Sequence, residues 1–313
     1  MKPETCFRTT IGGQALIEGI MMRGPIKQAV VVRKPDGDTI SQVQELKLIK
    51  DRHPILGVPL IRGSVNFLDS MVKGVKALMF SADFYPEDEE PSESKFDLWL
   101  ERVFGSEKAM KFVIGLAVLF GISFSVGLFI LLPTFLAGFL TKAIESTIVC
   151  NLIEGAIRII IFILYLIFCS RFKDMKRVFS YHGAEHKTIF CYEKGLPLTV
   201  ENARRQTRFH PRCGTSFLFV IMIVSILIFS VVSWSNVWIR MGLRLILLPV
   251  VVGITYEINR FVGRHDNALT RIVAAPGLWM QRFTTNEPDD SMLEVAIEAL
   301  ELVLPDQKGA DLW

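Results

Sequence analysis

Two histidines and a glutamate lie within one five-residue segment, His182-Gly183-Ala184-Glu185-His186. In a helix, residues four apart share one face, and Glu185 would lie beside the two histidines on it. Two imidazole nitrogens at this spacing can bind one metal ion, and a neighbouring glutamate can activate a metal-bound water. The pattern is therefore typical of a metal site that supports hydrolysis.

More possible ligands follow 24 residues after His186, in the segment His210-Pro211-Arg212-Cys213. Three of the five histidines thus lie within a 29-residue window. Farther along, Glu257 lies 71 residues beyond His186. This separation is like that of the third glutamate ligand in inverted zinc proteases, which carry the pattern H-x-x-E-H. The segments between these residues must fold so that the side chains meet.

We expect zinc, or another divalent transition metal, to be bound by the three clustered histidines: His182, His186 and His210. Either Cys213 or Glu257 is expected as a further ligand, with Glu185 as the general base. Four protein ligands would make a structural site, whereas three ligands and a water would make a catalytic one. A simpler interpretation is that the histidines cap backbone groups or contact lipid phosphates.

The composition indicates a membrane protein. Half of the 313 residues are hydrophobic, and the mean hydropathy is +0.38. The net charge is only +3, so the chain lacks the large excess of basic residues that is typical of nucleic-acid-binding proteins. The five cysteines are scattered and imply no disulfide framework. The first residues are polar, so we expect no cleavable signal peptide.

Long apolar runs predict about four transmembrane helices. No charged residue occurs between Lys111 and Lys142, a gap longer than the roughly 20 residues that span a bilayer. We place the spans at about 112–132, with Pro133 ending the helix, and at 148–170, 215–235 and 241–258.

Basic residues predict the orientation. They gather after the second span, before the third and after the fourth, whereas the other loops hold chiefly Lys142 and Arg240. Both termini and the His-rich loop 171–214 should therefore be cytoplasmic. This topology brings the candidate ligands to one membrane face.

Two charged residues, Glu154 and Arg158, fall inside the second predicted span. Their four-residue separation allows an ion pair within the helix. Charges inside a span are costly and indicate function by default, which here would be a transport path. Because both lie near one end, they can instead extend towards the interface.

Residues 1–54 are expected to form a small β-rich cytoplasmic domain. The runs 29–33 and 39–43 flank a Lys34-Pro35-Asp36-Gly37 turn and predict a hairpin. The preceding glycine-rich stretch 12–25 contains Glu18 and Arg23. It either cradles a phosphate or packs its backbone tightly against a neighbour.

The remaining flanking segments are predicted from periodicity and charge. Residues 55–82 form a basic amphipathic helix, 83–95 an acidic linker, 96–258 the membrane domain and 259–313 a helical cytoplasmic tail. The tail carries two further polar candidates, His265 and Asp266. Its last helix, 291–304, begins with Ser291 and Glu294 in a capping-box spacing.

Four segments in order also carry a resemblance: GGQALIEGIMMRGP, YHGAEHKTIFCYE, HPRCGTSFL and TTNEPDDSMLEVAIEAL. Together they resemble the YqhQ-like bacterial membrane family (DUF1385), and the resemblance covers nearly the whole chain. The family is generally labelled a predicted metal-dependent enzyme without an established substrate. The resemblance implies site residues His182, Glu185, His186, His210 and Cys213.

These observations predict an α-helical integral protein of the bacterial cytoplasmic membrane, with about four spans, a small β-containing N-terminal domain and a helical tail. Its expected partners are the lipid bilayer and a peptide or lipid-linked substrate, and its expected activity is metal-dependent hydrolysis. One alternative is a non-enzymatic scaffold or assembly factor that binds membrane-protein partners through the helices 55–82 and 291–304. A weaker alternative is a transporter.

Overall fold

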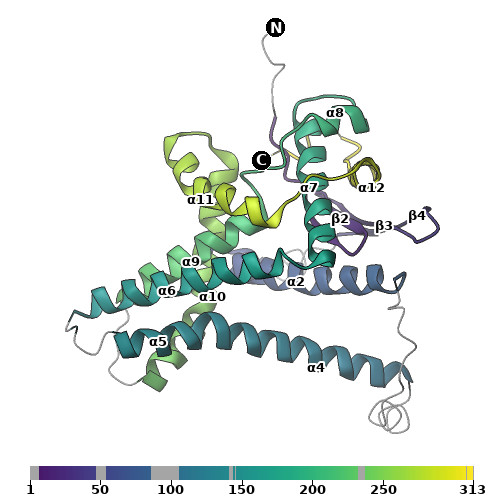
Figure 1. Cartoon of the computed structure of the whole chain (residues 1–313). Coiled ribbons are helices and arrows are strands. Elements are labelled where there is room, and N and C mark those ends of the chain that lie inside the picture. Colours follow the sequence, from purple (N-terminus) through teal and green to yellow (C-terminus); the bar gives the residue numbers. More distant parts are fainter. Residues whose placement is uncertain are drawn as a thin grey trace. The chain divides into compact units, whose positions relative to one another are not determined.

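The computed structural model describes residues 7–46, 54–85, 106–140, 144, 146–231, 237–307 and 309–312 (Figure 1). The chain forms two compact units. One comprises Met1–Tyr85, Leu164–Ile228 and Leu243–Trp313, and the other comprises Pro86–Ile163 and Phe229–Gly242. Most of the predicted acidic linker 83–95 lies outside the described residues. The first unit therefore joins both ends of the chain to the histidine-containing segment.

An antiparallel sheet in the first unit has the strand order β1-β2-β3-β4, with strands Gly12–Leu16, Gly19–Arg23, Lys27–Arg33 and Thr39–Glu45. The predicted hairpin is confirmed as β3 and β4, with Val31 opposite Ser41. Its turn is closed by a hydrogen bond from the Lys34 amide to the Asp38 carbonyl, 2.8 Å long. Gly37 supplies the positive φ of 94° that such a turn needs.

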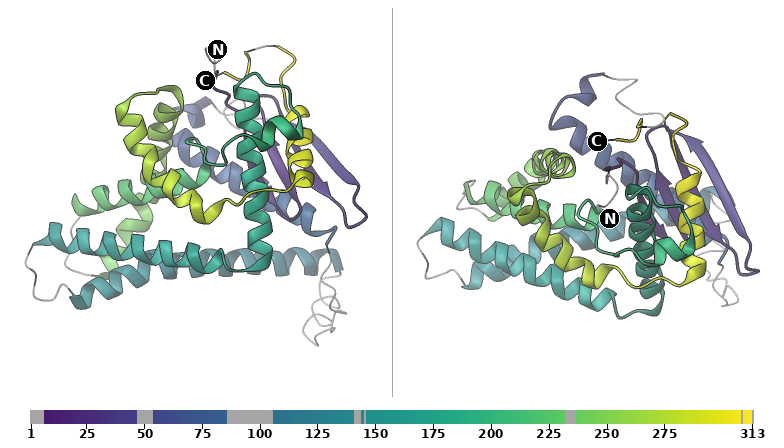
Figure 2. Two further views of the ribbon diagram at one scale, coloured as in Figure 1. Left: turned by 45° about the horizontal axis from the view of Figure 1, so that its top comes forward. Right: turned by 90° about the horizontal axis from the view of Figure 1, so that it is seen from above.

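Both faces of β2 and β3 are covered, which explains their continuous burial. On one face, Ile20, Met22, Ala29 and Val31 share a core with α7 (Lys173–Glu193) and α12 (Asp290–Glu301). On the other face, Met21, Val30 and Val32 pack with Ala77 of α2 (Ile61–Ala82). Figure 2 shows α7 and α12 beside the sheet. The sheet thus fixes the position of α7, which carries the H-x-x-E-H segment.

The glycine-rich stretch packs tightly against its neighbours. A Cβ atom on Gly24 would lie 2.4 Å from the carbonyl oxygen of Val303. Its two charged residues are engaged in ion pairs: Glu18 with Arg177, and Arg23 with Asp69 at 3.0 Å. These contacts support the packing interpretation of this stretch.

The predicted cap of the last helix is wrong by two residues. The carboxylate of Asp289, not the hydroxyl of Ser291, accepts the hydrogen bond from the Met292 amide, at 3.0 Å. Asp289 has extended backbone angles and precedes the first helical residue, as an N-cap must. Glu294 does not complete a box, and it pairs with Arg33 at 2.8 Å.

Three of the described helices are long and apolar enough to cross a membrane: Phe112–Leu140, Ile148–Cys169 and Met241–Arg264. The predicted count of about four is therefore corrected. The third predicted span, 215–235, contains the apolar helix Gly214–Ser230, within α9 (Gly214–Val231). Its 17 residues rise about 26 Å, less than a hydrocarbon core of about 30 Å. The other two candidate helices lie mainly in α6 (Thr147–Cys169) and α10 (Val237–Arg264).

Pro133 does not end the first span. The helix runs from α4 (Ser106–Val126) through a π-helical turn, Gly127–Leu131, into α5 (Leu132–Leu140). In a regular α-helix the carbonyl of Phe129 would accept from residue 133, but proline has no N–H. Arg158 donates to that carbonyl at 2.9 Å. This bond compensates for the proline, so the helix continues.

Within the second unit, Glu154 and Arg158 form the ion pair that their spacing predicts, with 3.1 Å between Oε1 and Nη2. The Thr134 hydroxyl donates to the same carboxylate oxygen at 2.8 Å. Both charged residues are buried, at 3% and 6% exposure. The two charges therefore pair with each other inside the unit, and Thr134 of α5 adds a hydrogen bond to the carboxylate.

Candidate metal centre

The H-x-x-E-H segment lies in the middle of α7, so His182, Glu185 and His186 share one helical face. The glycine inside the motif lies off this face and meets another segment. A Cβ atom on Gly183 would lie 2.0 Å from the carbonyl oxygen of Asn286. The helix-disfavouring residue is therefore required by the close approach of the segment that leads to α12.

Three potential ligands converge: His182, His186 and Cys213, whose ligating atoms all lie within 4.8 Å of one another. Nε2 of His182 is 3.1 Å from Sγ of Cys213. The cysteine comes from the residue immediately before α9, 31 residues beyond His182. The fold thus assembles a group of two imidazoles and one thiol from α7 and the start of α9.

Backbone carbonyls orient both imidazoles. Nδ1–H of His182 donates to the Thr284 carbonyl at 2.8 Å, and Nδ1–H of His186 donates to the Arg208 carbonyl at 2.5 Å. Histidine ligands of metal ions are typically held in this way, because the bond fixes the ring and leaves Nε2 for the metal. Nε2 of His186 is buried and has no hydrogen-bond partner among the described residues. A buried polar atom of this kind is a candidate to bind a water molecule or a metal ion.

Glu185 is held by one oxygen only. The Gly13 amide of β1 donates to its Oε1 at 2.9 Å, while Oε2 is buried without a partner in the described part of the chain. A Cβ atom on Gly13 would lie 3.0 Å from Cδ of Glu185 and 2.8 Å from the Met21 carbonyl oxygen. Burial raises the pKa of the Glu185 carboxyl, although His182 and His186 oppose this shift.

The cluster favours a charged pair of thiolate and imidazolium. Burial alone would raise the pKa of Cys213, but the two histidines hold it well below its usual range. Burial alone would lower the pKa of His182, yet the Cys213 thiolate raises it to about 9. The thiolate is the form of cysteine that binds metal ions. The environment therefore prepares Cys213 as a ligand at neutral pH.

Two hollows of the first unit meet at these side chains. One, of about 460 Å³, is lined by Glu185, His186 and Cys213. The other, of about 670 Å³, is lined by His182, Glu185 and Cys213, and by the apolar side chains Phe67, Phe217 and Leu218. The cluster thus has space beside it for a further ligand.

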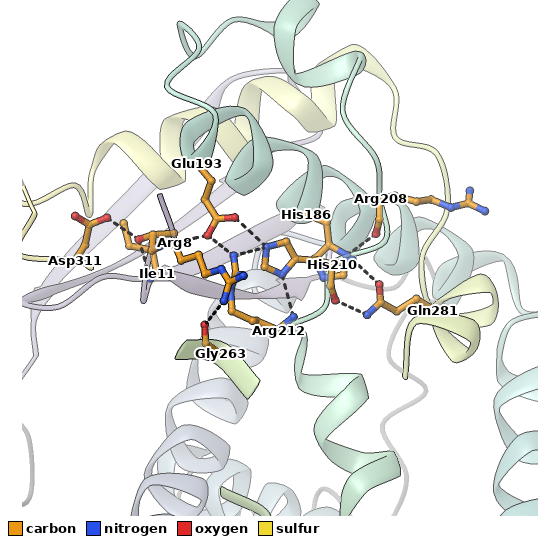
Figure 3. Close-up of polar contacts among 11 residues, drawn as sticks. Arg8, Ile11, His186, Glu193, Arg208, His210, Arg212, Gly263, Gln281 and Asp311 are labelled. Carbon is orange, nitrogen blue, oxygen red and sulfur yellow. Dashed lines mark hydrogen bonds and ion pairs between the residues drawn. The ribbon is translucent and has the colours of Figure 1, made fainter. Parts of the chain in front are cut away.

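The structure does not bring His210 into this group, and Figure 3 shows its imidazole in contact with Glu193 and Arg212. Its Nε2 lies 3.6 Å from Oε2 of Glu193, and the guanidinium of Arg212 pairs with the other oxygen of Glu193. Burial lowers the pKa of His210 to about 4, against the opposing effect of Glu193, so this histidine is neutral. Gln281 holds the backbone of His210 through two hydrogen bonds of 2.7 Å.

Glu257 is likewise engaged elsewhere. Its two carboxylate oxygens accept hydrogen bonds of 2.7 and 2.5 Å from Arg62 of α2. This bidentate pair joins α10 to α2 and uses both oxygens that a metal would need. Among the described residues, neither His210 nor Glu257 supplies an atom to the His182–His186–Cys213 group.

The remaining sequence candidates lie outside the group. His265 is exposed and donates Nδ1–H to the Phe261 carbonyl at 3.0 Å. Asp266 pairs with Arg8 and Arg271. The residues that orient the cluster were missed from sequence: Gly13, Arg208 and Thr284. Of these residues, only Gly13 belonged to a pattern that the sequence singled out, the glycine-rich stretch. Every residue type has a backbone carbonyl, so the sequence does not reveal which carbonyls accept from the histidines.

Comparison with known proteins finds relatives of uncharacterised function. Residues 58–306 match a family described as "Protein of unknown function (DUF1385)". The chain is 37% identical over 301 residues to the uncharacterized protein YqhQ of Bacillus subtilis (strain 168), which covers 94% of this chain and 92% of that protein. No solved structure matches the chain. The chain belongs to the DUF1385 family.

Proposed function

We propose that this chain is a zinc-dependent hydrolase of the bacterial cytoplasmic membrane. The observation that carries the proposal is the convergence of unsatisfied atoms. Nε2 of His186 and Oε2 of Glu185 are both buried without a partner in the described residues, next to Cys213. Buried polar atoms without partners are costly, and a bound cation and its water would satisfy both.

The donor set supports zinc. Imidazole and thiolate ligands suit zinc, whereas magnesium and calcium prefer oxygen. His182, His186 and Cys213 number three, and His210 and Glu257 are occupied by Glu193 and Arg62. Three protein ligands leave a fourth position open, as in catalytic sites. Zinc bound in this way would lower the pKa of a bound water to about 7.

Glu185 is the proposed general base. The Gly13 amide holds its Oε1, so the carboxylate is fixed in orientation and Oε2 is left to accept a proton. A base must lie within hydrogen-bonding reach of the proton that it takes, and the shared helical face places Glu185 between the two histidines in sequence and beside them in space. The hollow next to these side chains offers room for a substrate.

The membrane assignment extends the same proposal. Three apolar helices of sufficient length support it. The larger hollow at the metal centre is lined by Tyr256 and Asn259, near the end of the apolar span Met241–Arg264. We assign both termini and the 171–214 segment to the cytoplasmic side, because basic residues gather there. A substrate that is lipid-linked, or a peptide at the membrane surface, would reach the centre from this face.

The test combines metal content with activity. The detergent-purified full chain should contain about one equivalent of zinc by elemental analysis. It should hydrolyse at least one member of a panel of chromogenic ester, peptide and phosphodiester probes. Glu185→Gln removes the base but no ligand, so we expect it to keep the metal and lose about 10²- to 10⁴-fold of the rate.

Two outcomes would contradict the proposal. A Glu185→Gln variant with full activity would remove the base role. A folded wild-type chain that stays metal-free after incubation with zinc would remove the site itself. Metal retained with no hydrolysis of any probe, in wild type and variant alike, would favour a non-enzymatic scaffold in which the metal pins the 208–213 loop to α7.

A further inference from the structure

A third hollow of the first unit is lined by arginines. It has a volume of about 580 Å³, and four arginines belong to its lining: Arg23, Arg62, Arg260 and Arg264. No carboxylate belongs to its lining. Four cations without an acid make this the most positively charged of the hollows described above.

The charges are only partly compensated. Arg23 pairs with Asp69, and Arg62 pairs with Glu257. By contrast, Arg260 and Arg264 form no ion pair within 4.0 Å among the described residues, although Arg260 also interacts electrostatically with Glu257. They are four residues apart at the end of α10, so they share one helical face. Two positive charges therefore remain available to a ligand.

The neutral lining completes an anion site. Asn66 and Tyr256 join each other through a hydrogen bond of 3.0 Å, and Ser70 and Thr10 add hydroxyl groups. Guanidinium groups with hydroxyl and amide donors suit phosphate oxygens, because arginine presents several N–H donors in a planar fork. The chemistry of the hollow thus favours a phosphate group over a neutral ligand.

The hollow also lies where phosphate groups of lipids occur. The apolar span Met241–Arg264 ends at Arg264, and Arg260 lies one turn earlier. Basic pockets at the ends of transmembrane helices are typical binding sites for anionic lipid headgroups. At this position, the phosphate group of a membrane lipid can reach the positively charged hollow.

The arginine-lined hollow adjoins the metal centre. It shares Arg23 and Ser70 with the hollow that contains His186. It shares Asn66, Ser70 and Tyr256 with the hollow that contains His182. Ser70 lines all three, so one molecule can place a phosphate at the arginines and another part at the metal centre.

We propose that Arg260 and Arg264 bind the phosphate group of an anionic amphiphile, and that this amphiphile is the substrate class of the metal centre. The second part rests on the proposed hydrolase function, whereas phosphate binding at the arginines stands independently of it. The phosphate comes either from a membrane phospholipid or from a soluble phosphate ester.

Lipid binding to the detergent-purified full chain tests the first part. Native mass spectrometry would compare phosphatidylglycerol and phosphatidic acid with the zwitterionic phosphatidylcholine, with inorganic phosphate as a competitor. Arg260→Gln/Arg264→Gln should weaken binding of both anionic lipids by at least about tenfold, because two headgroup contacts are lost. The control, Arg171→Gln/Arg282→Gln, makes the same charge change at two exposed residues outside the hollow and should bind like wild type.

Each outcome decides the matter. Unchanged lipid affinity in the Arg260→Gln/Arg264→Gln variant would overturn the proposal. An equal loss of lipid affinity in the control variant would also overturn it, because the lipid would then be attracted by the overall charge of the protein. Competition by millimolar inorganic phosphate would identify the phosphate group alone as the ligand, and its absence would identify the lipid. Arg260→Lys/Arg264→Lys, together with the melting temperature, would separate loss of the site from unfolding. Zinc content should be the same in all variants, so failure here leaves the metal centre untouched.

Discussion

Two buried polar groups adjoin each other on α7 and the 208–213 loop, and they are completed differently. In the first, Glu193, His210 and Arg212 satisfy one another, and the Thr9 amide donates to Glu193 at 2.9 Å. In the second, the ligand atoms of His182, His186 and Cys213 lie within 4.8 Å of one another beside Glu185, yet Nε2 of His186 and Oε2 of Glu185 have no partner in the described residues. Both groups combine imidazole with carboxylate, and most of their side chains are buried.

The difference distinguishes a group of side chains that stabilises the fold from one that has atoms free to bind a ligand. A complete set of charges and hydrogen bonds holds the chain in place and needs nothing further. In the other set, main-chain carbonyls hold one side of each imidazole, while Nε2 of His186 and Oε2 of Glu185 stay unpaired among the described residues, which is the arrangement that our proposed metal site requires. The rings of His186 and His210 are only 5.5 Å apart, so residue type alone does not distinguish the two groups.

The largest expected effect is loss of the metal. His186→Ala removes a ligand, and zinc content should fall from about one equivalent to near zero after dialysis. His210→Ala should retain the metal, because Nε2 of His210 faces Glu193 and not Cys213. Elemental analysis of both variants beside His265→Ala, an exposed histidine, tests the contrast. Equal metal loss in a folded His210→Ala variant would erase the distinction between the two groups.

The next effect concerns stability. Glu193→Ala leaves the largely buried Arg212 without its partner, so the free energy of unfolding should fall by about 3 kcal/mol. The matched change Glu201→Ala removes an exposed acid from an i,i+4 pair with Arg205, and it should cost about 0.5 kcal/mol or less. Thermal melting of the purified chains would compare them. Similar melting temperatures for the two variants would show that the Glu193 group does not stabilise the fold.

The smallest effect is a difference in thiol reactivity with pH. The folded-state pKa of Cys213 is lowered, so in metal-free protein its thiolate persists as pH falls from 8 to 6. Burial raises the pKa of Cys191, so its already small thiolate fraction falls about tenfold per pH unit. Alkylation by iodoacetamide at pH 6–7, followed by peptide mass spectrometry, should label Cys213 at least about tenfold faster. Added zinc should protect it, and equal labelling of both cysteines would contradict the ion pair with His182.

The candidate site was only partly predictable from sequence. The spacing of His182, Glu185 and His186 predicted a shared face, and α7 confirms the helix that this requires. Nothing local distinguished His210 from Cys213, because both belong to one four-residue segment. Their roles depend on which side chains meet them from elsewhere, and Glu193 captures the histidine while the cysteine turns towards His182.

The same limit appears in the apolar regions. Hydropathy predicted apolar helices, but it could not show that the carbonyl freed by Pro133 is satisfied by Arg158, which lets the first span continue. Likewise, the number of residues between His186 and Glu257 is similar to a known ligand spacing. The carboxylate of Glu257 nevertheless accepts a hydrogen bond from Arg62 of α2.

By itself, the sequence determined the properties that depend on residue type and short-range periodicity: the apolar helices, the β3–β4 hairpin, the shared face of the H-x-x-E-H segment and the family. Only the tertiary structure decided which atoms remain unsatisfied. A ligand site contains hydrogen-bond donors and acceptors that have no partner once all pairs within the protein have formed. Which donors and acceptors stay unpaired depends on long-range contacts, such as those of Gly13 and Thr284 with α7. No local sequence pattern encodes these contacts.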